Sequence, residues 1–476
     1  MISKIQKQLF SVLSIGLLIA LSLSTNSCKK KGNLFSDGNL EFSVDTLVFD
    51  TIFTTIGSTT QQFKIYNEAN QQLEIEEVEL MGGTSSPFRI NLDGLIGTDF
   101  QNIIIPGNDS LFCFVEVTLG INGQNLPMVI EDSIRFRSNG VDQYVRLAVW
   151  GQDMYYHFSN TQAGIFDTNS GVWPNDKPHL IYGAAFVDSA ETLTIPAGTN
   201  IYLHKNSILW NYKGTLNIDG DVNNKVTLQG DRLESFYDDV SGQYYGIYFQ
   251  EALPSTIDNV VIKNATTGIH VDSRNTSTSS NTVTITNTEI SNSASYGILL
   301  YNEPKIFGEN VLVHSSGIHS LIVLQGADFV FNHCDFLGYG DGEGTSPSVG
   351  LRNYFTNSSG TTTVTDLTGQ FNNCVIWGST DEDQYVLDKI EAGGVTISVL
   401  FRNSVIRKSD ISGSEFTSCL NTNPLFLNTS EKNFSFSSST SSSLKNNGSS
   451  SYTTLIFDLV NEVRQAVPDI GCYEKL

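Results

Sequence analysis

Acidic residues gathered in two loops are the side chains of this sequence best placed to do chemistry. Asp341 and Glu343 lie in YGDGEGTSPSVG, with Arg352 after it, and Asp381 and Asp383 follow the apolar hexamer FNNCVI. Paired carboxylates can hydrolyse a glycosidic bond, and a polysaccharide lyase needs carboxylates around calcium with an arginine or lysine base. A chain this acidic also forms solvated acidic surface loops freely. We favour the surface interpretation and keep these five residues as candidate catalytic groups.

A further acidic segment begins like a calcium-binding loop. Asp219 and Asp221 stand in DGDVNN, but the sixth position is Asn224 instead of glycine and the twelfth is Gly230 instead of glutamate. A polar turn is therefore favoured. We expect no cofactor, with calcium as the one ion that the acidic loops could attract. One more loop, GDRLESFYDD, carries the acids Asp231, Glu234, Asp238 and Asp239.

The charge balance excludes one class of partner. The chain has 476 residues, and 50 acidic against 27 basic residues give a net charge of −23. Because nothing would neutralise phosphates, we expect no nucleic-acid partner. Its 39% apolar and 11% aromatic content is enough for a large core. Many short β-branched runs between Gly, Asn and Ser predict an all-β fold.

The first 27 residues have the features of a signal peptide. Lys4 and Lys7 precede an apolar run from 9 to 23, and Ser27 stands directly before Cys28. A run this short suits a signal core. The ending resembles a lipobox of Bacteroidota-type bacteria, which implies a lipid on Cys28 and residues 28–39 as a tether; an ordinary anchor or a cleaved signal is the alternative. We expect an outer-membrane-anchored lipoprotein, on the periplasmic side or at the cell surface.

Residues 40–153 show the alternation of a β-sandwich. Runs such as SLFCFVEVTLG and DSIRFRSNG alternate apolar and polar residues between turns. The run FKIYNEANQQLEIEEVEL resembles two strands of the immunoglobulin-like domains of bacterial envelope proteins, and the resemblance implies such a sandwich. Residues 154–190 are predicted to be a connector.

Between residues 191 and 420 the strands become shorter and the sequence repeats. LTI, IYL, ILW, LNI and VTL are separated by turns, which is typical of a parallel β-helix, where each coil adds three short strands. Hexamers at 257, 285, 308, 331, 371 and 401 align without gaps as IDNVVI, ITNTEI, GENVLV, FNHCDF, FNNCVI and FRNSVI. Their steps of 28, 23, 23, 40 and 30 residues fit coils of 20-odd residues with inserted loops. A second column, including GIYF, GIHV and GILL, keeps a constant phase.

The third hexamer position is asparagine in five of the six repeats, with His333 as the exception. Asparagine tolerates left-handed backbone, so it predicts a turn between two strands, and stacked amides can hydrogen-bond between coils. The repetition is therefore architectural, and FNHCDF is not a Cys–His–Asp site. The predicted ladder comprises Asn259, Asn287, Asn310, Asn373 and Asn403.

Two further segments resemble a known family. PDIGCYE resembles the closing motif of many bacterial β-helix proteins, and GDRLESFYDDVSGQYYGIYF is similar to a segment of β-helix lipoproteins of Bacteroidota-type bacteria. The resemblance is to the pectate-lyase-like β-helix superfamily. It implies a right-handed single-stranded parallel β-helix, with residues 421–476 capping its last coil, and it implies no settled activity.

A short motif resembles the O-glycosylation acceptor of envelope proteins from the same bacteria. Asp followed by Ser or Thr and then an apolar residue occurs five times. The resemblance implies acceptors at Thr46, Thr51, Ser110, Ser133 and Ser189.

Cys334 and Cys374 share the fourth hexamer position. On neighbouring coils they would lie about 4.8 Å apart, within disulfide reach. An extra coil inside the 40-residue step would separate them. We favour two buried thiols.

We therefore expect a cell-envelope protein that binds or scaffolds glycans or other envelope components without catalysis. The alternative is a polysaccharide lyase or glycoside hydrolase. An enzyme should place at least two of the four loop acids in one groove with a base, whereas acids on separate faces would contradict it. The expected partners are the membrane, through the lipid, and a polysaccharide or an envelope protein.

Overall fold

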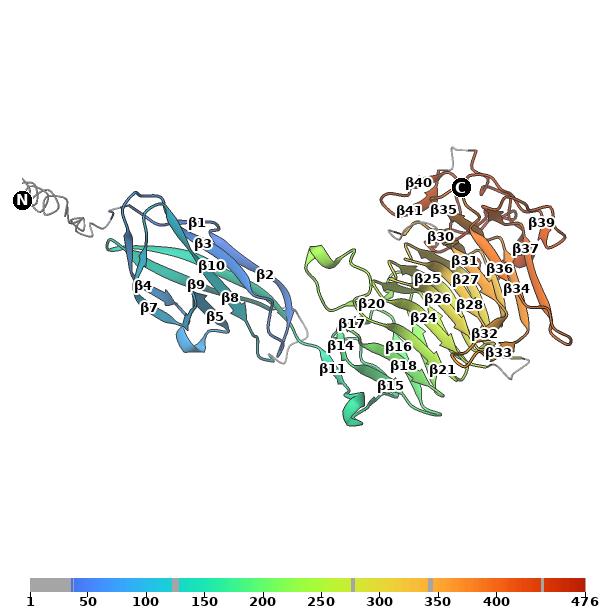
Figure 1. The fold of residues 1–476 in the computed structure, drawn as a ribbon, viewed down its shortest axis with the longest axis horizontal. Coiled ribbons are helices and arrows are strands. Elements are labelled where there is room, and N and C mark those ends of the chain that lie inside the picture. Colours follow the sequence, from blue (N-terminus) through green and yellow to red (C-terminus); the bar gives the residue numbers. More distant parts are fainter. Residues whose placement is uncertain are drawn as a thin grey trace, which may run out of the picture. The chain divides into compact units, whose positions relative to one another are not determined.

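The computed structural model describes residues 36, 38–121, 128–274, 279–340, 346–437 and 441–475. Cys28, Asp341 and Glu343 lie outside these ranges. The chain divides into two compact units, residues 1–122 with 126–152, and residues 123–125 with 153–476 (Figure 1). Within the described ranges no helix is long and apolar enough to cross a membrane. The helical turns there are η1 (Gly83–Ser85), η2 (Thr161–Ala163), η3 (Ser235–Tyr237) and η4 (Ser450–Tyr452).

The first unit is a sandwich of two five-stranded sheets whose inward side chains form one core. Burial alternates along its strands, and Phe63 and Phe136, one from each sheet, meet edge to face. Cys113 is a fully buried member of this core. One sheet has the order β1 (Glu41–Phe42), β3 (Gln61–Asn67), β8 (Asp109–Val117), β5 (Phe88–Leu92), β6 (Leu95–Gly97). The other has the order β2 (Thr46–Phe53), β10 (Val141–Gln152), β9 (Met128–Ser138), β4 (Leu73–Leu80), β7 (Asp99–Ile105).

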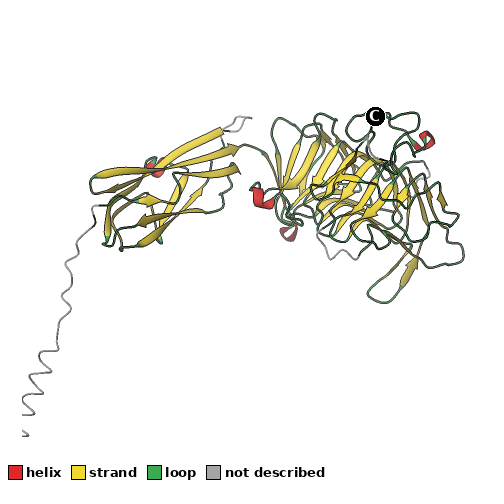
Figure 2. Cartoon of the chain, turned by 90° about the horizontal axis from the view of Figure 1, so that it is seen from above, coloured by secondary structure: helices red, strands yellow, loops and turns green. Residues whose placement is uncertain are grey.

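The second unit is a parallel β-helix, which confirms the predicted fold class (Figures 1 and 2). Its coils build two long parallel sheets. The larger sheet has eighteen strands: β11 (Tyr155–Phe158), β13 (Gly171–Val172), β14 (His179–Tyr182), β16 (Thr192–Pro196), β17 (Asn200–Leu203), β19 (Thr215–Asp219), β20 (Val226–Gly230), β22 (Ser255–Asp258), β23 (Val260–Lys263), β25 (Val283–Ser291), β27 (Lys305–His314), β29 (Ala327–Asn332), β30 (Asp335–Gly338), β34 (Leu367–Asn372), β35 (Val375–Gly378), β37 (Ile397–Arg402), β38 (Val405–Ile406) and β39 (Phe416–Thr417).

The smaller sheet forms another side of the coils. Its nine strands are β12 (Asp167–Thr168), β15 (Ala184–Val187), β18 (Ile208–Tyr212), β21 (Gly246–Gln250), β24 (Thr267–Asp272), β26 (Tyr296–Tyr301), β28 (His319–Leu324), β31 (Val349–Arg352) and β36 (Tyr385–Asp388). Two antiparallel pairs stand apart from both sheets, β32 (Tyr354–Thr356) with β33 (Thr362–Val364) and β40 (Phe426–Asn428) with β41 (Asn433–Phe436).

The six hexamers stack in the register that the sequence alignment gives. The first positions pair from Ile257 to Ile285, then Gly308, and onward to Phe331, Phe371 and Phe401. A Cβ on Gly308 would lie 2.5 Å from the Phe331 ring, which explains the glycine there. The 40-residue step therefore hides no extra coil. Its additional residues form the segment after β30 and the β32–β33 hairpin.

Cys334 and Cys374 consequently lie on neighbouring coils. Both are free thiols with no exposed surface. The Cys374 thiol donates to the Phe331 carbonyl at 3.3 Å, and the Cys334 thiol donates to the Asn332 carbonyl at 3.2 Å. Burial raises the pKa of the Cys334 thiol well above its usual value, so it is an inert core residue.

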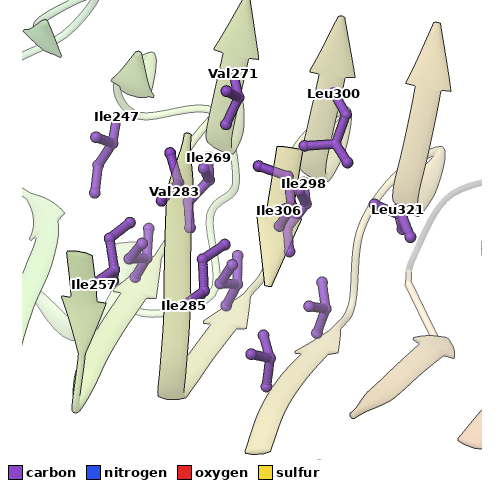
Figure 3. Packing of buried hydrophobic residues seen from close by; sticks show 14 of the residues in the cluster. Ile247, Ile257, Ile269, Val271, Val283, Ile285, Ile298, Leu300, Ile306 and Leu321 are labelled. Carbon is purple, nitrogen blue, oxygen red and sulfur yellow. The ribbon is translucent and has the colours of Figure 1, made fainter. Parts of the chain in front are cut away.

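Apolar side chains stack in columns inside the coils (Figure 3). Ile247, Ile269, Ile298 and Leu321 form one column, in register from coil to coil. Each fully buried side chain of this size contributes about 1.5–3 kcal/mol of hydrophobic stabilisation. The core is thus a repeated structure, and each coil is stable only against its neighbours.

The third hexamer position is a left-handed turn in every coil of the series. The φ angles lie between +48° and +56° for Asn259, Asn287, Asn310, His333, Asn373 and Asn403. Asn310 Nδ2 donates to Asn287 Oδ1 at 2.9 Å, and Asn287 Nδ2 donates to Asp258 Oδ1 at 2.9 Å. Asn403 instead donates to the Asn447 carbonyl. The backbone turn is therefore common to all six positions, whereas amide-to-amide bonding is local.

The C-terminal tail lies along the side of the coils instead of closing the last one, which differs from the expected cap. In the PDIGCYE motif, Gly471 N donates to the Asn373 carbonyl at 2.8 Å and Cys472 N donates to Asp335 Oδ1 at 3.2 Å. The reason is that several outward strand residues here are apolar and need cover. The tail and these residues form a second core of Leu312, Leu337, Val375, Trp377, Val405, Phe434, Phe436, Leu444, Leu459, Ile470 and Cys472.

Buried charges fix the tail in place. Glu309 is fully buried and accepts hydrogen bonds from the backbone N–H groups of Thr454 and Leu455 at 2.8 and 3.0 Å. Arg464 donates to Asn310 Oδ1 at 2.7 Å and lies 3.5 Å from Glu474. Such groups would be costly to leave unpaired, so they specify one position for the tail.

Asn287 offers a test of the turn. We expect the free energy of unfolding of Asn287→Val to be about 1–2 kcal/mol lower than that of Asn287→Gly, because a β-branched residue is strained at φ +48° whereas glycine is not. Asn287→Val should therefore unfold at a lower urea concentration. Both variants lose the same amide bonds, so the difference isolates the backbone. Thr284→Val, on the same strand but in extended backbone, should change stability by less than about 1 kcal/mol. Equal midpoints for the Val and Gly variants would contradict a strained turn.

Asp335 makes the stability depend on pH. Burial raises the pKa of this carboxyl from 3.8 to about 8, so the folded state holds a proton that the unfolded state releases. The stabilisation that comes from this proton on Asp335 is fully present below pH 4 and is lost as the pH rises through 8. Asp335→Asn mimics the protonated acid, so its advantage over wild type should grow between pH 5 and 8, by at most about 1.4 kcal/mol per pH unit.

Urea unfolding of both proteins at pH 5, 7 and 9 measures this difference. Asp328→Asn is the matched control, because Asp328 is an exposed carboxylate 3.8 Å from Lys305. The difference in unfolding free energy between this variant and wild type should be the same at all three pH values. A constant difference between Asp335→Asn and wild type across this range would show that Asp335 is ionised in the folded state.

Candidate functional site

Asp381 and Asp383, the loop acids that the sequence singles out and the structure describes, have different partners. Asp381 is fully exposed and lies 2.6 Å from Arg407, whereas Asp383 accepts hydrogen bonds from Lys408 at 3.1 Å and from the Ser409 backbone at 2.6 Å. Arg352 is not beside them, because it donates to Asp388 Oδ2 at 3.0 Å. Asp383 is thus the one candidate acid among the described residues that lines a groove.

That groove has a volume of about 600 Å³ and lies at the end of the nine-stranded sheet. Burial opposes ionisation of Asp383, but its hydrogen bonds with Ser409 and Lys408 leave its pKa below the usual value. Lys408 Nζ lies 3.1 Å from Asp383 Oδ2, so the candidate base of this groove is paired with the candidate acid. The groove is lined by Pro347, Glu382, Asp383, Tyr385, Val386, Leu387, Lys408 and Glu415.

The segment with Asp219 and Asp221 forms a polar turn. Asp221 Oδ1 accepts hydrogen bonds from the backbone N–H groups of Asn223 and Asn224, both at 2.9 Å, which lowers the pKa of the carboxyl. Asp219 lies in register with Asp258 on the next coil. Across the described ranges, no group of three His, Cys, Asp or Glu side chains is arranged to hold a metal ion.

The loop after β20 holds its acids in separate pairs. Asp231 Oδ2 lies 2.7 Å from His204 Nδ1, Arg232 lies 2.9 Å from Glu234, and Lys432 lies 2.5 Å from Asp239. These contacts fix the loop to its surroundings and leave no shared acidic centre.

An aromatic column on the outside of the nine-stranded sheet was missed by the sequence analysis. Phe186 pairs in register with Trp210, Trp210 with Tyr248, and Tyr248 with His270. Trp210 and Tyr248 stack with ring centroids 6.0 Å apart, and Tyr248 and His270 stack at 4.6 Å. Phe186 instead meets Trp210 edge to face, with centroids 5.2 Å apart. All four side chains are half-buried, so part of each ring faces solvent.

A polar column runs beside the aromatic one. Tyr212, Gln250, Asp272 and Tyr301 are in register on four successive coils. Tyr248 donates to Asp272 Oδ2 at 3.3 Å, which joins the two columns. We call these eight residues the aromatic face: Phe186, Trp210, Tyr212, Tyr248, Gln250, His270, Asp272 and Tyr301.

Hydrogen bonds set the protonation of this face. The Tyr245 hydroxyl lies 2.8 Å from His270 Nδ1, and burial lowers the pKa of His270 to about 4, so the imidazole is neutral at pH 7. Burial raises the pKa of Asp272, an effect opposed by its hydrogen bonds from Tyr248 and Asn302. The face therefore offers hydroxyl, amide, imidazole and carboxyl groups, and beside it Lys213 Nζ lies 4.8 Å from the Tyr212 ring centroid and 3.3 Å from Glu251.

The sequence contained a signal for this face. In the second repeated column, GIYF and GIHV, the third residue points away from the core and is Tyr248 or His270. The pairing of these coils with β15 and β18 could not be read from the sequence, because the intervening segments differ in length. The stack with Phe186 and Trp210 therefore appears only in the folded chain.

The chain resembles known proteins in part. Residues 155–336 match the family model of a right handed beta helix region. No curated protein matches the sequence. The catalytic domain of Agl-KA is 12% identical, with a TM-score of 0.28, over 75% of this chain and 79% of that domain.

Two other solved structures are similar at the same low level. The catalytic unit of a GH87 α-1,3-glucanase from Streptomyces thermodiastaticus is 10% identical, with a TM-score of 0.26, over 72% of this chain and 74% of that unit. A family 123 glycoside hydrolase from Clostridium perfringens is 8% identical, with a TM-score of 0.18, over 24% of this chain; the match spans 26% of that enzyme's length. Likeness at this level carries no information about activity. The chain is an all-β protein that contains a right-handed parallel β-helix region at residues 155–336.

Proposed function

We propose that this protein is a lipid-anchored cell-envelope protein whose β-helix binds a glycan chain along the aromatic face without cleaving it. The observation that carries the proposal is the register of half-exposed aromatic and polar side chains over five successive coils, β15 to β26. An extended polymer could contact each coil in turn. Strands hold these side chains rigidly, so little conformational entropy is lost on binding.

The chemistry of the aromatic face suits an uncharged sugar chain. The solvent-facing edges of the stacked Trp210 and Tyr248 rings can contact the apolar faces of sugar rings, and tyrosine hydroxyls can meet sugar hydroxyls. Gln250 and Asp272 add amide and carboxyl acceptors in the adjacent column. Because Lys213 beside the face is paired with Glu251 and Asp272 adds a carboxyl group, we expect a neutral glycan to bind better than a polyuronate.

The separation of the carboxylates supports binding over hydrolysis. Asp272 is the acid of the polar column, and Asp388 ends β36, which is four strands from β24 in the sheet. At about 4.8 Å per strand they lie roughly 19 Å apart. Glycosidases need two carboxyl groups about 5–9.5 Å apart. Asp388 is also engaged by Arg352 and by the Tyr354 hydroxyl.

Anchoring and glycosylation complete the proposed envelope role. Lipidation at Cys28 would tether the protein to the outer membrane, on its periplasmic side or at the surface. Four proposed glycosylation acceptors share one geometry, since the preceding Asp Oδ1 accepts the acceptor's own backbone N–H at 2.7–2.8 Å. Those four are Thr51, Ser110 and Ser133, which are half-buried, and Ser189, which is exposed like Thr46.

A glycan array followed by titration with the best neutral ligand tests the proposal. Trp210→Ala and Tyr248→Ala should each weaken binding about fivefold or more, because truncating a central aromatic contact costs above about 1 kcal/mol. Phe236→Ala removes an aromatic ring that is 77% exposed on the loop after β20 and should leave affinity unchanged. Thermal melts confirm that each variant is folded.

Two outcomes would contradict the proposal. Equal loss of binding in Phe236→Ala would show that the aromatic face is not the binding surface. Release of reducing ends or unsaturated products from a bound glycan would establish cleavage and favour the lyase or hydrolase alternative.

A further inference from the structure

The last strand of the nine-stranded sheet has an open edge. β36 pairs with β31 on one side, and within the described residues no strand pairs with its other side. The following chain passes only the start of β36, where Gln384 N donates to the Arg407 carbonyl and Ser409 N donates to Asp383. An edge of this kind presents unpaired N–H and C=O groups to any added strand.

The hydrogen-bond register shows which groups face the open edge. Val349 N on β31 donates to the Gln384 carbonyl, and Val349 is the register partner of Tyr385. In a parallel pair, this bond directs the N–H and C=O of Val386 toward β31. By alternation, the backbone groups of Tyr385 and Leu387 point the other way. The open edge therefore offers two donors and two acceptors at the spacing of an extended strand.

The 600 Å³ groove runs along this edge, because Tyr385, Val386 and Leu387 all line it. Val386 is 46% exposed, so an apolar side chain of an added strand has a surface to contact. Three acids and one base also line the groove, which gives a formal charge of −2. Lys408 is paired with Asp383 at 3.1 Å. Glu382 and Glu415 are exposed carboxylates whose negative charge is not offset by this lysine.

We propose that β36 binds an extended, lysine- or arginine-containing peptide of a partner protein as an additional parallel or antiparallel strand. Main-chain bonds to Tyr385 and Leu387 would supply affinity, and Glu382 and Glu415 would select basic side chains. A second copy presenting the same edge is disfavoured, because it would bring the same two acids against them. This site is independent of the glycan proposal, since the aromatic face lies on coils β15 to β26.

Fluorescence anisotropy with the full-length protein tests strand addition. The probe is a labelled peptide of alternating Val and Lys, seven residues long, compared with its Val and Glu counterpart. We expect the Lys peptide alone to bind. N-methylating one alternate set of its amides should weaken binding at least tenfold, while methylating the other set should change it less than twofold, because only one set faces the edge.

Charge selection is tested with Glu382→Gln/Glu415→Gln. This double variant should bind the Lys peptide at least fivefold more weakly and with a smaller dependence on salt. Glu391→Gln is the matched control, because Glu391 is a nearby exposed acid paired with Lys389 and outside the groove; it should bind as wild type.

Four results would overturn the proposal. Equal effects of the two N-methylated sets would show electrostatic attraction without strand pairing. If the double variant binds the Lys peptide as tightly as wild type, the two glutamates do not select basic side chains. If the Lys peptide does not bind at all, the edge is not a site for basic peptides. Self-association that the Lys peptide inhibits competitively would show that the edge pairs with a second copy.

Discussion

From residue 257 onward the β-helix depends on one backbone constraint, a single left-handed residue at the same corner of six successive coils. Six consecutive hexamers place φ near +50° at their third position. One residue is too short a connection to absorb any insertion, so the two strands that it joins keep a fixed stagger. Each neighbouring coil must copy that stagger to pair with both strands. From residue 257 onward insertions are confined to the other corners, which is why the steps between hexamers are uneven while the register is not. In the preceding coil residues 220–225 form a longer connection at this corner, between β19 and β20.

The constraint also decides what the outside of the coils can present. Identical positions stack about 4.8 Å apart, so one residue type recurring in the sequence becomes a continuous column. On one side such columns are apolar, with Leu312, Leu337 and Trp377, and the C-terminal tail covers them. On the nine-stranded sheet the columns are aromatic and polar and stay half-exposed. The protein therefore has one outer side used for its own stability and one available for a ligand.

Charge is distributed according to the same division. Glu309, Asp335 and Glu474 are fully or almost fully buried where the tail meets the coils, and Arg464 is their nearby cation. Protonation of Asp335 stabilises the folded state. The loop acids on the outer surface are instead paired one by one with Arg, Lys or His, as in Asp381 with Arg407. Asp381 and Asp383, two of the acids that first suggested catalysis, are both engaged in this way. Glu382 and Glu415, beside the unpaired edge of β36, are the acids for which the structure suggests a ligand.

The sequence by itself determined the β-helix, its register and the position of its turns, because hexamers that repeat without gaps require strands that stack without slippage. It also predicted that FNHCDF is architecture, since His333 stands in the asparagine position, and in the structure His333 has the same left-handed φ. It could not place the tail, whose contacts join residues more than a hundred positions apart, such as Glu309 and Thr454. The aromatic face and the open edge of β36 were likewise decided only by the tertiary structure, because both arise where segments of unequal length bring distant strands into one sheet.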